Sequence, residues 1–522
     1  MLKTQYIFAN SKFRSQLINN LLDGTIVIEP NACKCIYKLK AAKSGNTLYS
    51  INLDKNGAAD KCDYQTTLEN LGYSLNYLGK GSYGFASKVC LDKKCKMNYA
   101  IKVIMYENNP KYGKFDALDR PENLEVSIFK KLNERILFPK ISPHIALYIQ
   151  DFRCNGIPVL WEKGNEIAFD EYIDNVIDWD GKLNYLTDKA IVLISELAHY
   201  GSINSLIKRN PDLIDEETLG VIYFQFVYTL GQIQKIMPGF RHNDSHSGNI
   251  LAQTDKNFNQ VLDLYYIYQY EGLYYKIPLI ATQIKFWDYD FANIIGETNN
   301  FKSKEFSPDS FGYRHTKNHY YDLHIFTNDL LMMRDPILSG KNLMPTIPVN
   351  SEIVKLFETV VPPIYYGRST KNTSYGRLKP DIEYITPHKL LTQNPYILKN
   401  FAVNLDQIDI TKIVDSYGID FDELKKLVAI ASTKTTKIKI QPKIPVVKKQ
   451  ILEKPTQITT GSLCEIPKSK KVFPQGKCRT GSGHKPCPPK SRWCAYCLSN
   501  VTNCAHNKLT RTKGSYSFKI PS

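Results

Sequence analysis

RHNDSHSGNI, residues 241–250, places two histidines, an aspartate and two asparagines within ten positions of the chain. Two histidines four positions apart with a carboxylate between them could bind a metal ion on one face of a helix. Gly248 and the neighbouring Ser and Asn residues argue against a helix here. The alternative is a phosphoryl-transfer loop, in which Asp244 orients a hydroxyl group and Asn249, five residues later, binds magnesium beside ATP.

A glycine-rich stretch, NYLGKGSYGFASKVCL at residues 76–91, lies upstream of this loop. Three of its glycines have GxGxxG spacing, which lets the backbone approach phosphate groups closely. Strand-like sequence on both sides favours a β-hairpin that covers ATP over the strand-turn-helix of a dinucleotide site. The residues expected in this phosphate lid are Gly79, Lys80, Gly81, Ser82 and Gly84.

Two charged residues follow in segments that are otherwise apolar. Lys102 is the one charged residue in the β-rich run MNYAIKVIMY, and it would simply face solvent if it stood alone. In PENLEVSIFKKLNERI, apolar residues recur at helical spacing and Glu125 lies beside the apolar face. A solvent-facing glutamate is the alternative to one that reaches a lysine on a neighbouring strand. The two residues together favour an ion pair between the strand and the helix.

A further carboxylate follows a short apolar strand in IKFWDYDFAN, residues 284–293. If the strand ends at Trp287, Asp288 is the metal ligand, and Asp290 takes the place that glycine usually holds in the Asp-Phe-Gly triplet of phosphoryl-transfer enzymes. If Asp290 is the ligand instead, Trp287 and Asp288 fall where the buried strand should finish. We therefore favour Asp288 and keep Asp290 as the alternative.

A glycine lid, a strand lysine, a helix glutamate, HxDxxxxN and a strand-end aspartate in this order form the protein-kinase signature. From about Leu71 to Asn404 the chain resembles the protein-kinase superfamily, and more closely the divergent serine/threonine kinases of large nucleocytoplasmic DNA viruses (iridovirus- or mimivirus-like). Three features resemble that branch: His246 in the loop, the aromatic insertion at 264–283, and NHYYDLHIF with Asp322 placed to buttress the loop.

The resemblance implies an α+β, bilobal fold with a small β-rich N-lobe and a mainly helical C-lobe. It also implies roles for the site. Asp244 would position and deprotonate the attacking hydroxyl, and His246 would lie near the γ-phosphate as a pH-sensitive cation. Lys102 would pair with the phosphates and with Glu125. The remaining expected contacts are Mg2+ with Asn249 and Asp288, and adenine with the hinge from Glu196 to Ala198.

Two departures from the family pattern bear on regulation and on substrate docking. Asn243 replaces the arginine that clasps a phosphorylated activation loop in many kinases, so we expect constitutive activity and no switching by that route. The Ala-Pro-Glu triplet of the substrate-docking segment does not occur between Asp288 and Asp322, which leaves that segment unassigned.

The net charge of +17 is concentrated in the C-terminal tail. From Thr433 to Ser522 there are 19 Lys and Arg residues against two acidic ones, while the rest of the chain holds 49 of each sign. Such a tail is typical of a flexible basic arm that binds nucleic acid or acidic proteins. Its candidate zinc ligands are Cys478, Cys487, Cys494, Cys497, Cys504 and His506, although reduced cysteines without metal fit equally well.

We expect an N-terminal extension (1–70), a kinase-like domain (71–405), a C-terminal helical segment (406–432) and the basic tail (433–522), largely disordered or a small zinc-binding module. The N-terminus lacks the pattern of a signal peptide, and no apolar run is long enough to cross a membrane, so host cytoplasm or virion is expected.

The predicted function is ATP- and Mg2+-dependent transfer of phosphate to Ser or Thr of viral or host proteins. Two alternatives stay open: a small-molecule kinase of the aminoglycoside-phosphotransferase type, and a pseudokinase scaffold that binds nucleic acid through the tail.

Overall fold

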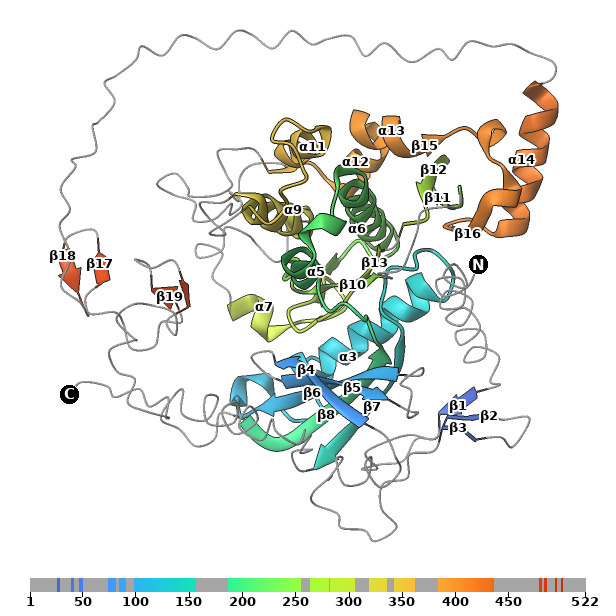
Figure 1. The fold of residues 1–522 in the computed structure, drawn as a ribbon. Helices are drawn as coiled ribbons and strands as arrows, with labels where there is room; N and C mark the ends of the chain where they lie inside the picture. Colours follow the sequence, from blue (N-terminus) through green and yellow to red (C-terminus); the bar gives the residue numbers. More distant parts are fainter. Residues whose placement is uncertain are drawn as a thin grey trace. The chain divides into compact units, whose positions relative to one another are not determined.

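Figure 1 shows the fold in a computed structural model, in which α-helices and β-strands are combined. The structure describes seven short strands near the two ends of the chain and residues 74–80, 84–90, 98–155, 186–254, 263–280, 282–305, 319–335, 342–361 and 384–435. The chain divides into two compact units, Met1–Lys439 and Ile440–Ser522.

A five-stranded antiparallel sheet carries the glycine-rich stretch and Lys102. Its order is β4-β5-β6-β8-β7, with β4 at Ser74–Lys80, β5 at Gly84–Cys90, β6 at Asn98–Glu107, β7 at Tyr148–Asn155 and β8 at Leu186–Glu196. The predicted hairpin is confirmed, because β4 and β5 pair antiparallel. A Cβ atom on Gly84 would lie 2.0 Å from the Val103 carbonyl oxygen, so glycine is needed where β5 approaches β6.

Helix α3 (Pro121–Leu132) packs against this sheet (Figure 1). Pro121 occupies the first helical position, where a backbone N–H would have no partner within the helix. The face predicted from the periodicity is buried, including Leu124, Ile128 and Leu132. The helix runs directly into a π-helical turn, η2 (Asn133–Leu137).

The helical part of the first unit is built around α6 (Glu216–Ile236), which is buried from Leu219 to Ile233. Phe226 of this helix stacks on Phe286 and Phe326, with ring centroids 5.0 and 4.0 Å apart, so one core joins α6 to a strand and to a second helix. The other helices are α5 (Ile203–Arg209), α7 (Phe301–Glu305), α9 (Tyr321–Arg334), α11 (Glu352–Val360), α12 (Pro387–Gln393), α13 (Pro395–Phe401) and α14 (Phe421–Thr435).

RHNDSHSGNI forms a loop between two short strands, so its histidines do not share a helical face. β9 (Phe240–Arg241) precedes the loop and pairs with β14 (Asn293–Ile294). β10 (Ile250–Thr254) follows it and pairs with β13 (Thr282–Phe286). The two pairings bring the loop next to the segment that begins at the end of β13.

The aromatic insertion at 264–283 forms a hairpin of β11 (Tyr265–Tyr270) and β12 (Leu273–Pro278). Its turn residues, Glu271 and Gly272, have φ angles of 49° and 80°, the left-handed conformation that tight hairpins favour. β15 (Ala402–Val403) and β16 (Ile413–Tyr417) complete a four-stranded sheet. The region 406–432 therefore contains a strand of this sheet as well as most of α14.

The ends of the chain hold the seven short strands. β1 (Ile26–Ile28), β2 (Leu39–Ala41) and β3 (Thr47–Tyr49) form a small sheet near the N-terminus. In the second unit, β17 (Cys478–Thr480) pairs with β18 (Gly483–Lys485), and β19 (Trp493–Cys494) pairs with β20 (Ser499–Asn500). The other candidate zinc ligands, Cys487, Cys497, Cys504 and His506, lie outside the described residues. The three boundaries between the four predicted segments stay predictions.

A membrane-spanning segment was not expected from the sequence. Within the ranges that the structure describes, none of the helices combines the length and the apolar character needed to cross a bilayer.

Candidate active site

Lys102 stands in the middle of β6 and forms ion pairs with two carboxylates. Its Nζ atom lies 2.5 Å from Glu125 Oε1 in α3 and 2.7 Å from Asp288 Oδ1 beyond the end of β13. The side chain of Glu125 is 3% exposed and that of Asp288 is 32% exposed, so Asp288 is the member of the group open to a ligand. Three residues predicted from separate motifs therefore meet at one point of the fold.

The three charges fix one another's ionisation. Burial acts to lower the pKa of Lys102, but the charges of Asp288 and Glu125 outweigh burial and hold this pKa well above its usual value. Burial raises the pKa of Glu125 to about 7, against the opposing charge of Lys102. For Asp288, burial acts to raise the pKa, but Lys102 outweighs it and the pKa is lowered. Lys102 and Asp288 are therefore charged at neutral pH.

Asp322, in the first turn of α9, holds the loop between β9 and β10. Its carboxylate accepts the backbone N–H groups of His242 and Asn243, both at 2.8 Å, and its carbonyl oxygen accepts the Ser245 hydroxyl at 2.7 Å. The His242 ring donates from Nε2 to the Trp287 carbonyl oxygen at 2.9 Å. Asp322 is fully buried, so these contacts fix the loop against both α9 and the end of β13.

Asp244, Asn249 and His246 face one another within the loop. The Asn249 amide donates to the Asp244 carbonyl oxygen at 2.9 Å and to Asp244 Oδ2 at 2.8 Å. His246 Nε2 lies 3.7 Å from Asp244 Oδ1, and the Gly248 N–H donates to His246 Nδ1 at 3.0 Å. Because Nδ1 is an acceptor, the proton of the neutral ring resides on Nε2 and faces Asp244.

Glycine at position 248 leaves room for the His246 ring. A Cβ atom there would lie 2.5 Å from His246 Cε1, so the partly exposed imidazole ring would have to move. The same loop raises the pKa of Asp244, mainly through burial and against the opposing charge of His246. The carboxylate is thus a stronger base than an exposed aspartate.

The structure distinguishes the two aspartates of IKFWDYDFAN. β13 ends at Phe286, one residue earlier than the sequence indicated, and Asp288 adopts a φ of 64° that directs its carboxylate to Lys102. Such left-handed conformations of residues other than glycine concentrate at functional sites. Asp290 is 8% exposed and accepts hydrogen bonds from Lys302 Nζ at 2.8 and 2.9 Å. The geometry favours Asp288 as the candidate metal ligand.

The side chains of the candidate site could hold a metal ion only together with other ligands. In the part of the chain that the structure describes, no three His, Cys, Asp or Glu side chains could hold a metal ion by themselves. Magnesium, however, usually binds through one or two carboxylates together with waters and substrate phosphates. Asp288 and the amide oxygen of Asn249 fit that kind of site, and both residues are partly exposed.

The predicted adenine hinge follows the end of β8. The Glu196 N–H donates to the Leu147 carbonyl oxygen at 2.9 Å, and the Glu196 carboxylate accepts the Leu147 N–H at 3.0 Å. Ala198 is 8% exposed, and its carbonyl oxygen accepts the N–H of Gly201 at 3.1 Å. The hinge is therefore anchored on the chain just before β7.

The phosphate lid is described only in its strands. Gly79 of β4 lies opposite Ala86 of β5. Gly81 and Ser82 fall between the two strands, outside the described residues, and so does the side chain of Lys80. Their contact with ATP stays a prediction.

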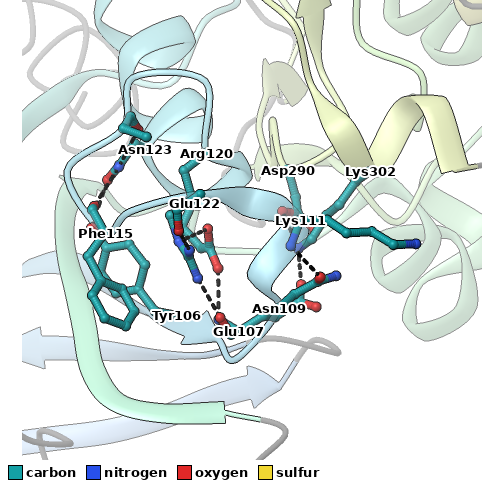
Figure 2. Close-up of polar contacts among 12 residues, drawn as sticks. Tyr106, Glu107, Asn109, Lys111, Phe115, Arg120, Glu122, Asn123, Asp290 and Lys302 are labelled. Carbon is teal, nitrogen blue, oxygen red and sulfur yellow. Dashed lines mark hydrogen bonds and ion pairs between the residues drawn. The ribbon is translucent and has the colours of Figure 1, made fainter.

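A buried charge cluster beside the site was not predicted from the sequence (Figure 2). Lys302 Nζ lies 2.8 Å from Asp290 Oδ1 and 2.9 Å from Glu107 Oε1, and Arg120 Nε lies 3.0 Å from Glu122 Oε2. In the sequence, Lys302 has the pattern of a lysine on a solvent-facing helix. The one signal was Asp290, a carboxylate where the family pattern has glycine.

Comparison with known proteins agrees with this geometry. No family model matches the chain. A protein of Acanthamoeba polyphaga mimivirus, whose name proposes a serine/threonine-protein kinase, is 30% identical over 359 residues, which cover 66% of this chain and 73% of that protein. The chain therefore belongs to the protein-kinase superfamily, among the divergent serine/threonine kinases of large DNA viruses.

Proposed function

We propose that the protein is an ATP- and Mg2+-dependent serine/threonine protein kinase with the bilobal architecture of its family. The observation that carries the proposal is the bridge that Lys102 makes between Glu125 and Asp288, beside a loop that presents Asp244 and Asn249. The name of the mimivirus relative supports kinase chemistry. The five-stranded sheet with α3 would be the small lobe, and the part around α6 the large one.

In the proposed reaction, the hydroxyl oxygen of Ser or Thr attacks the γ-phosphorus of ATP. The bond to the β–γ bridging oxygen breaks, and ADP leaves. Asp244 accepts the hydroxyl proton, which its raised pKa favours. Lys102 binds the phosphates with a charge that its carboxylate partners maintain.

Bound magnesium would neutralise the negative charge that develops on the phosphate oxygens. Asn249 and Asp288 would supply its protein ligands. His246 presents Nε2 towards Asp244 and is 43% exposed at the side chain, so it can donate a hydrogen bond to a γ-phosphate oxygen. The hinge at Glu196 to Ala198 would bind adenine, and the lid from Gly79 to Gly84 would cover the phosphates.

Transfer of radiolabelled γ-phosphate from ATP with magnesium tests this function. The assay would offer the protein itself, a basic and an acidic test protein, and simple alcohols and aminoglycosides. Asp244→Asn should reduce transfer by roughly 100-fold or more, the scale expected when a general base is removed. Asp212→Asn, at an exposed aspartate outside the site, is the matched control and should transfer normally.

Label on Ser and Thr of proteins, lost in the Asp244 variant alone, is the expected result. Label on small alcohols but on no protein would favour the small-molecule kinase. No transfer by folded wild-type protein to any acceptor would refute the proposal in favour of a pseudokinase.

A further inference from the structure

The buried charge cluster connects the three elements that carry the ion-paired site. Lys102 and Glu107 belong to β6, Glu122 and Glu125 to α3, and Asp288 lies two residues before Asp290. Each element thus contributes one residue to the site and one carboxylate to the cluster. Figure 2 shows Lys302, from α7, directed at two of these carboxylates.

The contacts inside the cluster are short and shielded from water. Lys302 and Glu107 are each 3% exposed at the side chain, and Glu122 is 0% exposed. The Glu107 N–H donates to Glu122 Oε1 at 2.8 Å, which ties the end of β6 to the first turn of α3. Arg120 donates to the Glu107 carbonyl oxygen and to that of Gly113, and so closes the connection between the two elements.

The segment that carries Lys302 is itself folded and docked. The amide of Asn300 donates to the carbonyl oxygens of Asp290 and Ala292 at 2.8 and 2.9 Å. The ring of Phe301 stacks on Tyr112 with centroids 6.4 Å apart. These contacts set α7 against the chain between β6 and α3, with Lys302 as the cation at the junction.

A second contact lies near the other end of α3. Glu297 accepts hydrogen bonds from Lys131 at 2.8 Å and from Arg135 at 3.2 Å. These side chains are 28–41% exposed, so the pairs are weaker than those around Lys302. The segment after Asp288 therefore contacts α3 directly through Glu297, and it reaches the first turn of α3 indirectly, through Glu107 of β6 and its bond to Glu122.

Kinase activity requires that the strand lysine, the helix glutamate and the strand-end aspartate be aligned, and phosphorylation of the activation segment commonly controls that alignment. We propose that Lys302 is a positioning residue that aligns Lys102, Glu125 and Asp288 without phosphorylation. Its ammonium group pairs with both Asp290 and Glu107 and so binds the segment after Asp288 to β6. This inference rests on the proposed function for its kinetic consequence, while its structural consequence can be measured separately.

Removal of the charge tests the proposal in the full-length protein. Lys302→Met should lower kcat at least about tenfold, because two buried carboxylates lose their cation and the segment after Asp288 loses its link to β6. The KM for ATP should change less, since the adenine hinge is anchored on Leu147, which is not part of the cluster. Lys302→Arg should restore most of the activity. Lys399→Met, which removes an exposed ion pair with Glu352, is the control.

A second variant separates alignment from folding. The variant is a triple one that combines Lys302→Met with Glu107→Gln and Asp290→Asn. Because it leaves no uncompensated charge among these three residues, its thermal midpoint should be higher than that of Lys302→Met alone. kcat should stay low because the bridge is still missing. A triple variant or a stable single variant with kcat within twofold of wild type would overturn the proposal.

Two further measurements keep the inference independent of substrate identity. Wild-type protein treated with phosphatase should keep its activity, and a tenfold loss on that treatment would contradict the proposal. Hydrogen exchange of the amides in α3 should be faster in Lys302→Met than in Lys399→Met. If wild type transfers no phosphate, the proposed function has failed, and the exchange result alone decides whether Lys302 positions α3.

Discussion

Replacement of Asp322 by asparagine tests whether the loop around Asp244 depends on a buried carboxylate. Asp322 accepts two backbone N–H groups of the loop, those of His242 and Asn243, through its two carboxylate oxygens. Asparagine keeps one acceptor oxygen but presents an NH2 group to the second donor. The variant therefore loses one charge-assisted hydrogen bond, weakens the other and leaves a backbone N–H unsatisfied.

The size of the effect follows from these contacts. A hydrogen bond to a charged group contributes about 1.5–3 kcal/mol, and an unsatisfied buried donor costs about 1–3 kcal/mol. Because the loop can relax partly, we expect a net loss of about 2–4 kcal/mol in the native loop conformation. That loss corresponds to a decrease in kcat between roughly 30-fold and several hundred-fold.

Steady-state phosphate transfer, with thermal unfolding of the same samples, measures this change. Asp329→Asn is the matched control, because Asp329 accepts a single loop N–H, that of Ser247, at 2.8 Å, and asparagine can keep that bond. We expect the control to lose less than about fivefold in kcat, the equivalent of one weakened hydrogen bond. The reasoning is refuted if folded Asp322→Asn protein keeps kcat within threefold of wild type.

Two further predictions concern His246 and Glu125. Gly248→Ala should displace the His246 ring, because the added Cβ would meet Cε1 at 2.5 Å. Its kcat should fall about as far as that of His246→Ala, with little change in the thermal midpoint because the ring is partly exposed, and a wild-type kcat in Gly248→Ala together with a reduced kcat in His246→Ala would contradict the steric argument. Since burial raises the pKa of Glu125 above its unfolded value, stability from this group is present at low pH and lost as pH rises towards 7. The free energy of unfolding of wild type minus that of Glu125→Gln should therefore fall between pH 5 and pH 8, whereas the exposed control Glu134→Gln should show no such trend.

The sequence predicted the parts of the site that depend on local pattern. Glycine spacing, strand-type residues around Lys102 and helical periodicity around Glu125 each follow from short-range rules, and the order of the motifs implied that they meet. The apolar pattern predicts the end of β13 one residue late, because it continues through Trp287 although the strand pairing stops at Phe286. Strand boundaries depend on partners that a linear pattern does not contain.

The burial of Lys302 and its ion pairs could not be predicted from the sequence, for a different reason. Lysine is rarely buried, so FKSKE reads as a polar helix on the surface. Its burial depends on Glu107, almost two hundred residues earlier in the chain, and on Asp290. A pairing of that kind has no periodicity and no fixed spacing, so only the unusual aspartate at position 290 pointed to it.

Two departures from the family pattern can be understood as one arrangement. Asn243, at the place of the usual loop arginine, is 7% exposed and donates from its amide to the Phe291 carbonyl oxygen at 2.9 Å. A neutral amide suits that contact, because a buried guanidinium there would need a counter-charge. Asp290, at the place of the usual glycine, receives its cation from Lys302 instead. On this proposal, Lys302 in the segment after Asp288 supplies the positive charge that other kinases carry at the loop position of Asn243. Its partners are the carboxylates of Asp290 and Glu107. A phosphate on the segment would then find no arginine at position 243 to receive it, and kinase activity would depend on Lys302.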